Sequence, residues 1–208
     1  MANLNHNSKE LNLKVVYYGT GLCGKTTNLR SVFAAMPPDR KGQMMSLATE
    51  LDQTLFFDFL PIDLGSVKGW KLRFHLFTVP GQIYYNVSRK LVLKNVDGLV
   101  FVVDSQEDRL DENIESYNNL MDNLRDYNYS LDDIPMVIQY NKRDLPDILP
   151  ISDLQLRLNQ KGFTYFESVA MRGIGVFDTL KSICQLIVLK QIDKLPDIRT
   201  ASGEPVPQ

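Results

Sequence analysis

The chain has 208 residues, of which 44% are hydrophobic, 23% charged and 10% aromatic, a balance that favours one folded domain and excludes a disordered chain. Its 23 basic and 25 acidic residues give a formal charge of −2, without the basic excess that is typical of nucleic-acid and anionic-membrane binders. Its two cysteines, Cys23 and Cys184, make no disulfide framework and fit a reducing compartment, so we expect a cytoplasmic protein.

No segment of the sequence predicts a direct membrane anchor. Residues 1–12 are polar and lack the apolar stretch of a secretory signal. The longest apolar runs, such as Leu99–Val103, are much shorter than the about 20 residues of a spanning helix. Neither a myristoylation nor a prenylation signal is present. We therefore expect any contact with a membrane to go through a partner.

Strand-like and helix-like patterns alternate along residues 1–194, which predicts a single α/β domain with a doubly wound, mostly parallel sheet and helices on both faces. The predicted strands are Leu13–Tyr18, Thr54–Leu60, Lys71–Val79, Leu99–Val103, Ile134–Tyr140 and Phe163–Glu167, of which the second and third form a hairpin. The predicted helices are Thr26–Ala35 and segments within 110–124 and 176–187. Residues 37–53 have no clean period and are predicted to be a loop. The polar residues 195–208 are predicted to be a disordered tail.

A glycine-rich string between the first strand and the first helix carries the clearest chemistry. Residues 19–26 read Gly-Thr-Gly-Leu-Cys-Gly-Lys-Thr, the pattern of a phosphate-binding loop. Gly19, Gly21 and Gly24 allow successive amides to turn toward phosphate oxygens, and the following helix N-terminus adds partial positive charge. Lys25 is then expected to reach the terminal phosphates, and Thr26 to offer a hydroxyl to Mg²⁺.

Asn141-Lys142-Arg143-Asp144 follows directly on a central strand, at the sheet edge where α/β folds bind ligands. A carboxylate there accepts hydrogen bonds from both N1–H and the exocyclic amine of guanine, whereas adenine presents a lone pair on that edge. Because an unpaired buried polar group is costly, such a site discriminates strongly between the two bases. Together with the phosphate loop, the segment predicts a guanine nucleotide, with Asn141 and Asp144 reading the base.

Two shorter segments complete the candidate site. Gly81, in Pro80-Gly81-Gln82 after the third strand, is expected to offer an amide to a γ-phosphate, and Gln82 to orient the attacking water. The triplet at the end of the last strand is expected to give a backbone amide to the guanine carbonyl; it consists of Ser168, Val169 and Ala170.

The order of these motifs resembles that of Ras-like small GTPases over about residues 11–190, with Thr54 on the segment after the first helix. More narrowly, strings such as Gly-Leu-Cys-Gly-Lys-Thr-Thr-Asn-Leu and Phe-Thr-Val-Pro-Gly-Gln resemble the bacterial MglA family of polarity and gliding-motility switches. That family lacks the usual aspartate at the metal-proximal end of the third strand, and Thr78 agrees with this habit.

The resemblance implies a Ras-like fold that binds GTP or GDP with Mg²⁺ and changes its partners with the nucleotide. Thr54 is implied to meet Mg²⁺ and the γ-phosphate, and to act in hydrolysis together with Lys25 and Gln82. Leu22, Cys23 and Thr27 join the phosphate-binding residues, and Lys142 joins the guanine-binding ones. The implied partners are a dimeric Roadblock-fold activator and polarity or motility effectors that recruit the protein, itself a monomer, to a cell pole.

Residue 53 departs from the family pattern. Members carry an arginine just before the switch threonine, implied to act as an arginine finger, whereas this chain has Gln53. Such an arginine contributes about 10³ to 10⁵ in rate. Slow hydrolysis, or hydrolysis that depends on an arginine from a partner or from elsewhere in the chain, is therefore the hypothesis.

Two other functions stay open at this level. A GTP-binding scaffold with little or no hydrolysis fits Gln53, although Gln82 favours hydrolysis. A kinase for small molecules is poorly supported, because no arginine-rich lid insertion is present and Asp144 would repel N1 of adenine.

Overall fold

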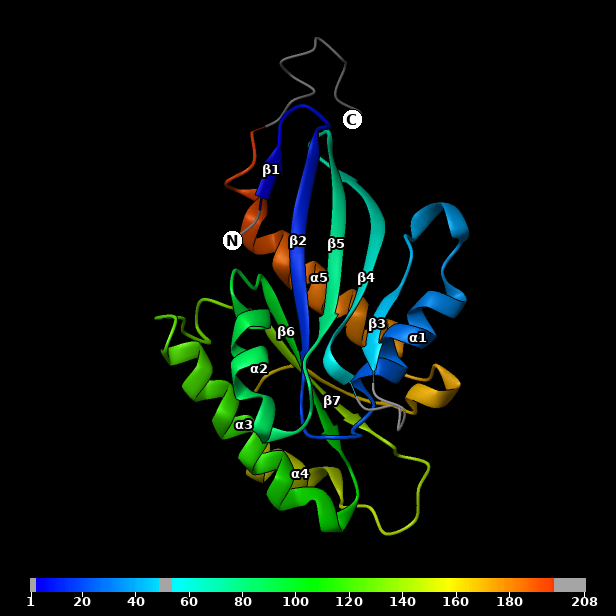
Figure 1. The fold of residues 1–208 in the computed structure, drawn as a ribbon, viewed down its shortest axis with the longest axis vertical. Helices are drawn as coiled ribbons and strands as arrows, with labels where there is room; N and C mark the ends of the chain where they lie inside the picture. Colours follow the sequence, from blue (N-terminus) through cyan, green and yellow to red (C-terminus); the bar gives the residue numbers. More distant parts are fainter. Residues whose placement is uncertain (1–2, 49–53, 197–208) are drawn as a thin grey trace.

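One twisted sheet forms the centre of the computed structural model, which describes residues 3–48 and 54–196 (Figure 1). Its strand order is β3-β4-β5-β2-β6-β7-β8, with β1 paired to β2. Five strands are mutually parallel: β2 (Glu10–Tyr18), β5 (Trp70–Thr78), β6 (Gly98–Asp104), β7 (Met136–Asn141) and β8 (Tyr165–Glu167). The strands that pair antiparallel are β1 (Asn3–Asn5), β3 (Met45–Ala48) and β4 (Thr54–Val67). The predicted mostly parallel sheet is confirmed.

Helices cover both faces of this sheet. One face packs against α1 (Lys25–Ala35) and α5 (Val176–Ile192), and the other against α2 (Asn86–Leu93), α3 (Leu110–Arg125) and α4 (Ile151–Leu158). The split follows from side-chain alternation in β2, because Val15 and Tyr17 lie in the first core whereas Val16 and Tyr18 lie in the second. The sheet is therefore buried on both sides, which explains the continuous apolar runs of its central strands β6 and β7.

The predicted hairpin and three predicted helices are confirmed. The hairpin is β4 and β5, with Phe59 opposite Phe77 and Ile62 opposite Phe74. The helices are α1, α3 and α5. The sequence did not identify α2 and α4, which are short.

The prediction of a loop at residues 37–53 is wrong in part. Pro38–Arg40 forms a 3₁₀ turn, and Met45–Ala48 forms β3 at the edge of the sheet. Met45 pairs with Phe59, and the Ser46 hydroxyl donates a hydrogen bond to Asp58 on β4. These partners are distant in sequence, so a segment without local strand periodicity becomes a strand through tertiary pairing.

The end of the sheet opposite the predicted motifs holds the C-terminal segment. Trp70, at the start of β5, is fully buried, and its indole N–H donates to the Pro196 carbonyl at 2.8 Å. Leu195 is also buried, so contacts with the domain continue to Pro196. The rest of the predicted tail, residues 197–208, lies outside the described residues.

Within the described ranges, every helix is too short or too polar to span a bilayer.

Candidate functional site

The predicted motifs meet at one edge of the sheet. The glycine-rich loop follows β2, Val79–Gln82 follows β5, Asn141 ends β7, and Ser168–Ala170 follows β8. Because these strands are parallel, their carboxyl ends share this edge. Thr54 opens β4, which runs antiparallel to β5, so its backbone lies at the same edge. The Thr54 side chain and the whole of Gln53 lie outside the described residues.

The glycine-rich loop is tightly wrapped. Gly24 has φ +105°, and a Cβ there would lie 2.2 Å from the side-chain amide nitrogen of Asn141. Cys23 is buried with a free thiol, which supports the interpretation of this side chain as packing. Leu22 has φ +61° and is 66% exposed, so its side chain lies outside the loop.

Lys25 lies inside this loop, at the start of α1, with Thr27 half-buried two positions later. Its side chain is 5% exposed, and its ammonium donates to the carbonyls of Gly19 at 3.0 Å and Thr20 at 2.6 Å. Burial lowers the pKa of this ammonium. A buried cation without a carboxylate in direct contact is what an incoming phosphate group stabilises, so the loop has the chemistry of an anion site.

A carboxylate that the sequence analysis missed lies beside Thr26. Asp58, on β4, is fully buried, and its Oδ2 accepts hydrogen bonds from the hydroxyls of Thr26 at 2.5 Å and Thr78 at 2.7 Å. Thr78 also accepts a hydrogen bond from the Asp58 backbone N–H at 2.9 Å. The available signal was a lone acidic residue in the aromatic string Phe56-Phe57-Asp58-Phe59. Asp58 thus places a carboxylate next to Thr26, even though the residue at the end of β5 is Thr78 and not an aspartate.

These oxygens fit a magnesium ion. Mg²⁺ prefers carboxylate and hydroxyl oxygens and keeps several waters and phosphate oxygens, so it needs few protein ligands. Thr26 and Asp58 supply one hydroxyl and one carboxylate in direct contact. No group of three or more metal-binding His, Cys, Asp or Glu side chains occurs among residues 3–48 and 54–196.

Asn141 joins three of the predicted motifs. Its side-chain amide donates to the Cys23 carbonyl at 2.8 Å, while its Oδ1 accepts from the Ser168 hydroxyl at 3.0 Å and from the Ala170 N–H at 2.9 Å. Asn141, Ser168, Val169 and Ala170 are all buried. The Ala170 amide, expected to face the base, is thus engaged with Asn141, and Asn141 braces the loops that carry the predicted base-binding residues.

Two other residues of that segment, Lys142 and Asp144, form ion pairs. Asp144 is exposed, with one carboxylate oxygen 3.8 Å from the Arg172 guanidinium. Lys142 has φ +65°, and its ammonium lies 2.5 Å from Oδ2 of the buried Asp104. Both side chains are partly exposed and both are ion-paired within the protein, Asp144 with the exposed Arg172 and Lys142 with the buried Asp104.

The Pro-Gly-Gln turn lies directly on the glycine-rich loop. A Cβ at Gly81 would lie 2.3 Å from the Gly21 Cα, so only glycine permits this approach. The Gln82 side chain is exposed beside this contact. The structure thus places Gln82 next to the phosphate loop.

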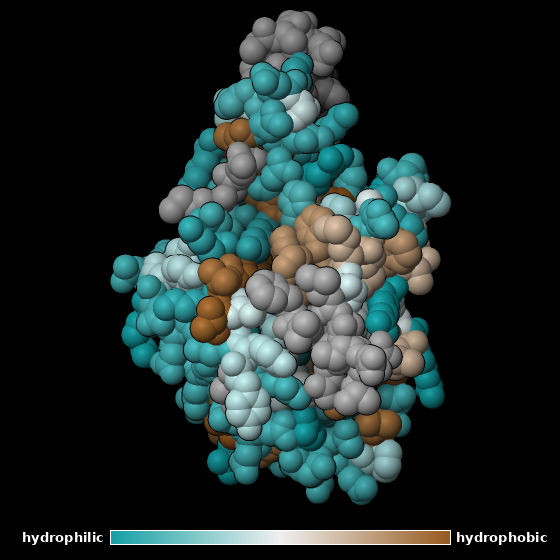
Figure 2. All heavy atoms as spheres, in the orientation of Figure 1, coloured by the Kyte–Doolittle hydropathy of each residue, from teal (hydrophilic) through white to brown (hydrophobic). Residues whose placement is uncertain are grey.

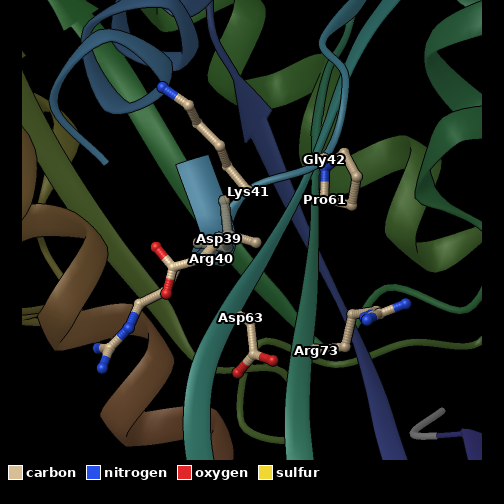
Figure 3. Close-up of a pocket in the computed structure, with 8 residues that line it drawn as sticks. Asp39, Arg40, Lys41, Gly42, Pro61, Asp63 and Arg73 are labelled. Carbon is tan, nitrogen blue, oxygen red and sulfur yellow. The ribbon is translucent and has the colours of Figure 1, made fainter. Parts of the chain in front are cut away.

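A pocket of about 160 Å³ lies elsewhere, beside the middle of β4 and β5 (Figure 3). Its lining includes Asp39, Arg40, Asp63 and Arg73, and Figure 3 shows the Lys41 side chain running away from these strands. Arg73 precedes Thr78 by five residues, or about 17 Å of strand, and the lining has mixed charge. This pocket is separate from the phosphate loop.

Two comparisons with known proteins agree with this geometry. The sequence pattern of the ADP-ribosylation factor family matches residues 43–187. The chain is also 52% identical over 188 residues to the mutual gliding-motility protein MglA of Myxococcus xanthus (strain DK1622), and the alignment covers 90% of this chain and 96% of that protein. The similarity therefore extends over nearly the whole fold.

Proposed function

The chain belongs to the ADP-ribosylation factor family of small GTPases, and we propose that it is a switch that binds GTP or GDP with Mg²⁺ and hydrolyses GTP. The arrangement of Lys25, Thr26 and Asp58 carries this proposal, because a buried ammonium lies beside a hydroxyl–carboxylate pair that joins the end of the glycine-rich loop to β4. The high identity to a gliding-motility protein supports a role in cell motility or polarity.

Each residue then has a defined task. Lys25 and the loop amides hold phosphate oxygens, and the Asp144 carboxylate accepts hydrogen bonds from guanine. Thr26 and Asp58, with Thr54, hold Mg²⁺, which when bound neutralises charge on the phosphates. Gln82 orients the attacking water, and Gly81 donates its N–H to the γ-phosphate. Asn141, Ser168 and Ala170 keep the loops around the base in register.

A partner surface adjoins Gln82. Exposed apolar side chains follow it on the 3₁₀ turn and α2, namely Tyr84 (94% exposed), Val87 and Leu91. Figure 2 shows hydrophobic residues in brown over the region of α2, and a further tan to brown area farther right on the same face. Large apolar residues that gather on a surface mark protein contacts. This surface is therefore the proposed docking site of a Roadblock-fold activator and of effectors. Binding to such partners would recruit the protein to a cell pole.

Single-turnover hydrolysis of GTP with Mg²⁺ tests the proposal. We expect turnover in the wild type that rises with the activator and falls about 100-fold in Gln82→Ala, because the attacking water loses its orienting amide. Gln160→Ala, at an exposed glutamine beyond α4, is the matched control and retains the wild-type rate.

The variant Gln53→Arg sharpens the same experiment. We expect it to accelerate hydrolysis in the presence of the activator, since it restores the arginine of related proteins. Tight GTP binding without turnover in any protein or condition contradicts the proposed hydrolysis and leaves a GTP-binding scaffold.

A further inference from the structure

The phosphate loop holds Leu22 in an unfavourable backbone conformation. Leu22 has φ +61°, a left-handed conformation that is unfavourable for a residue with a side chain. Its side chain is mostly exposed, so burial offsets little of this cost. Other contacts must therefore hold this part of the phosphate loop in place.

Arg109 makes such a contact. It ends a 3₁₀ turn, Glu107–Arg109, just before α3, and its Nη2 donates a hydrogen bond to the Gly21 carbonyl at 2.9 Å. In a planar trans peptide the carbonyl and the following N–H point in opposite directions. The Leu22 N–H therefore points away from Arg109. Gly81 also packs against Gly21, so this peptide adjoins the turn that carries Gln82.

The guanidinium of Arg109 is itself fixed by carboxylates. Nη1 donates to Glu112 at 2.5 Å, and Nε lies 3.9 Å from Oδ2 of the buried Asp104. Glu112 also accepts a hydrogen bond from the Thr20 hydroxyl at 3.1 Å. One ion-paired network thus holds both Thr20 and Gly21 of the phosphate loop.

The charges in this network decide what Arg109 can contribute. Asp104 also pairs with Lys142 at 2.5 Å, so two cations, Arg109 and Lys142, are matched by two carboxylates, Asp104 and Glu112. Little net positive charge remains for a phosphate. The contribution of Arg109 is therefore a directional hydrogen bond, which sets the orientation of one peptide.

We propose that Arg109 is a positioning residue for GTP hydrolysis, which aims the Leu22 N–H at the terminal phosphates by holding the Gly21 carbonyl from the α3 side. The inference rests on the proposed function, since the phosphates belong to the bound GTP. Arg109 thus acts on the reaction indirectly, through the backbone of the phosphate loop.

The test compares Arg109→Ala with Arg125→Ala. Arg125 lies on α3 and forms an exposed ion pair with Asp122 three residues before it, at 2.9 Å, which makes it a matched control. We expect Arg109→Ala to slow single-turnover GTP hydrolysis about 10- to 100-fold, because a misaligned amide loses part of its stabilisation of the transition state. Its GDP affinity and midpoint of thermal unfolding stay within threefold and a few degrees of the control. Arg109→Lys restores part of the rate.

A second readout does not depend on hydrolysis. In ¹H–¹⁵N spectra, the Leu22 amide resonance shifts when a nonhydrolysable GTP analogue with Mg²⁺ binds, and we expect this shift to shrink in Arg109→Ala but not in Arg125→Ala. An equal Leu22 shift in both variants overturns the proposal. If the wild type does not hydrolyse GTP, the proposed hydrolysis fails, while the Leu22 shift still decides whether Arg109 orients this amide.

Discussion

The proposed nucleotide site has a guanine end and a metal end, which are built from different interactions. At the guanine end, Asn141 links three loops through neutral, buried hydrogen bonds. At the metal end, Thr26 and Thr78 converge on one buried carboxylate, Asp58. The first arrangement is an uncharged frame, whereas the second carries a negative charge that a bound cation would neutralise. Affinity for the base and response to the metal are therefore assigned to separate groups.

The largest effect is expected at the frame. Asn141→Ala removes three buried hydrogen bonds and leaves the Cys23 carbonyl and the Ala170 N–H without this partner, which costs about 3 kcal/mol in the free energy of unfolding. Because the loops that Asn141 links lose their fixed relative positions, we expect GDP and GTP affinity to fall together by about 100-fold or more. Urea denaturation and nucleotide titration measure the two quantities.

Asn159→Ala is the control for that variant. Asn159 also makes three side-chain hydrogen bonds in a nearly buried position, to Gln155 and to the backbone of Phe163, but it follows α4. We expect a similar loss of stability and an unchanged affinity. If both variants bind nucleotide equally well, the hydrogen bonds of Asn141 do not hold the nucleotide site in shape.

An intermediate effect is expected at the metal end. Asp58→Asn keeps the size of the side chain and removes its charge, so we expect the Mg²⁺-dependent part of GDP affinity to fall about 10-fold, with little change in EDTA. Asp63→Asn, on the same strand, keeps an acceptor for the Gly65 N–H and serves as the control. An equal dependence on Mg²⁺ in Asp58→Asn and wild type contradicts the assignment of Asp58.

Asp58 also shows where prediction from sequence ended. The phosphate loop, the hairpin and α1, α3 and α5 have local patterns and were predicted. A single aspartate among phenylalanines has no local meaning, because its partners Thr26 and Thr78 lie 32 and 20 residues away. Arg109 was missed for the same reason, since it is 88 residues from Gly21. Asn141 was predicted from its motif, but its bracing contacts depend on how the loops pack.

The smallest effect is expected in the free energy of unfolding when Lys25, the buried cation between the two ends, is replaced. Burial lowers the pKa of Lys25 in the ligand-free protein, so the folded state binds this proton less tightly than the unfolded state. Its charged form therefore opposes folding at neutral pH, and this cost fades as pH rises toward the unfolded pKa of about 10.4.

Lys25→Met removes this charge at similar length. We expect the ligand-free variant to be about 1 kcal/mol more stable than the wild type at pH 7, with a smaller difference at pH 9.5. Urea denaturation at the two pH values measures the change. A variant that is less stable at pH 7, or a difference that grows with pH, shows that the buried ammonium stabilises the loop on its own.

The position of Trp70 determines what an optical probe reports. It is the single tryptophan of the chain and lies at the start of β5, whereas the nucleotide site lies beyond Thr78 at the other end of that strand. Because its indole is buried and bonded to Pro196, its fluorescence emission senses the docking of the C-terminal segment. Intrinsic fluorescence will therefore follow release of that segment, and exchange of nucleotide needs a label on the nucleotide itself.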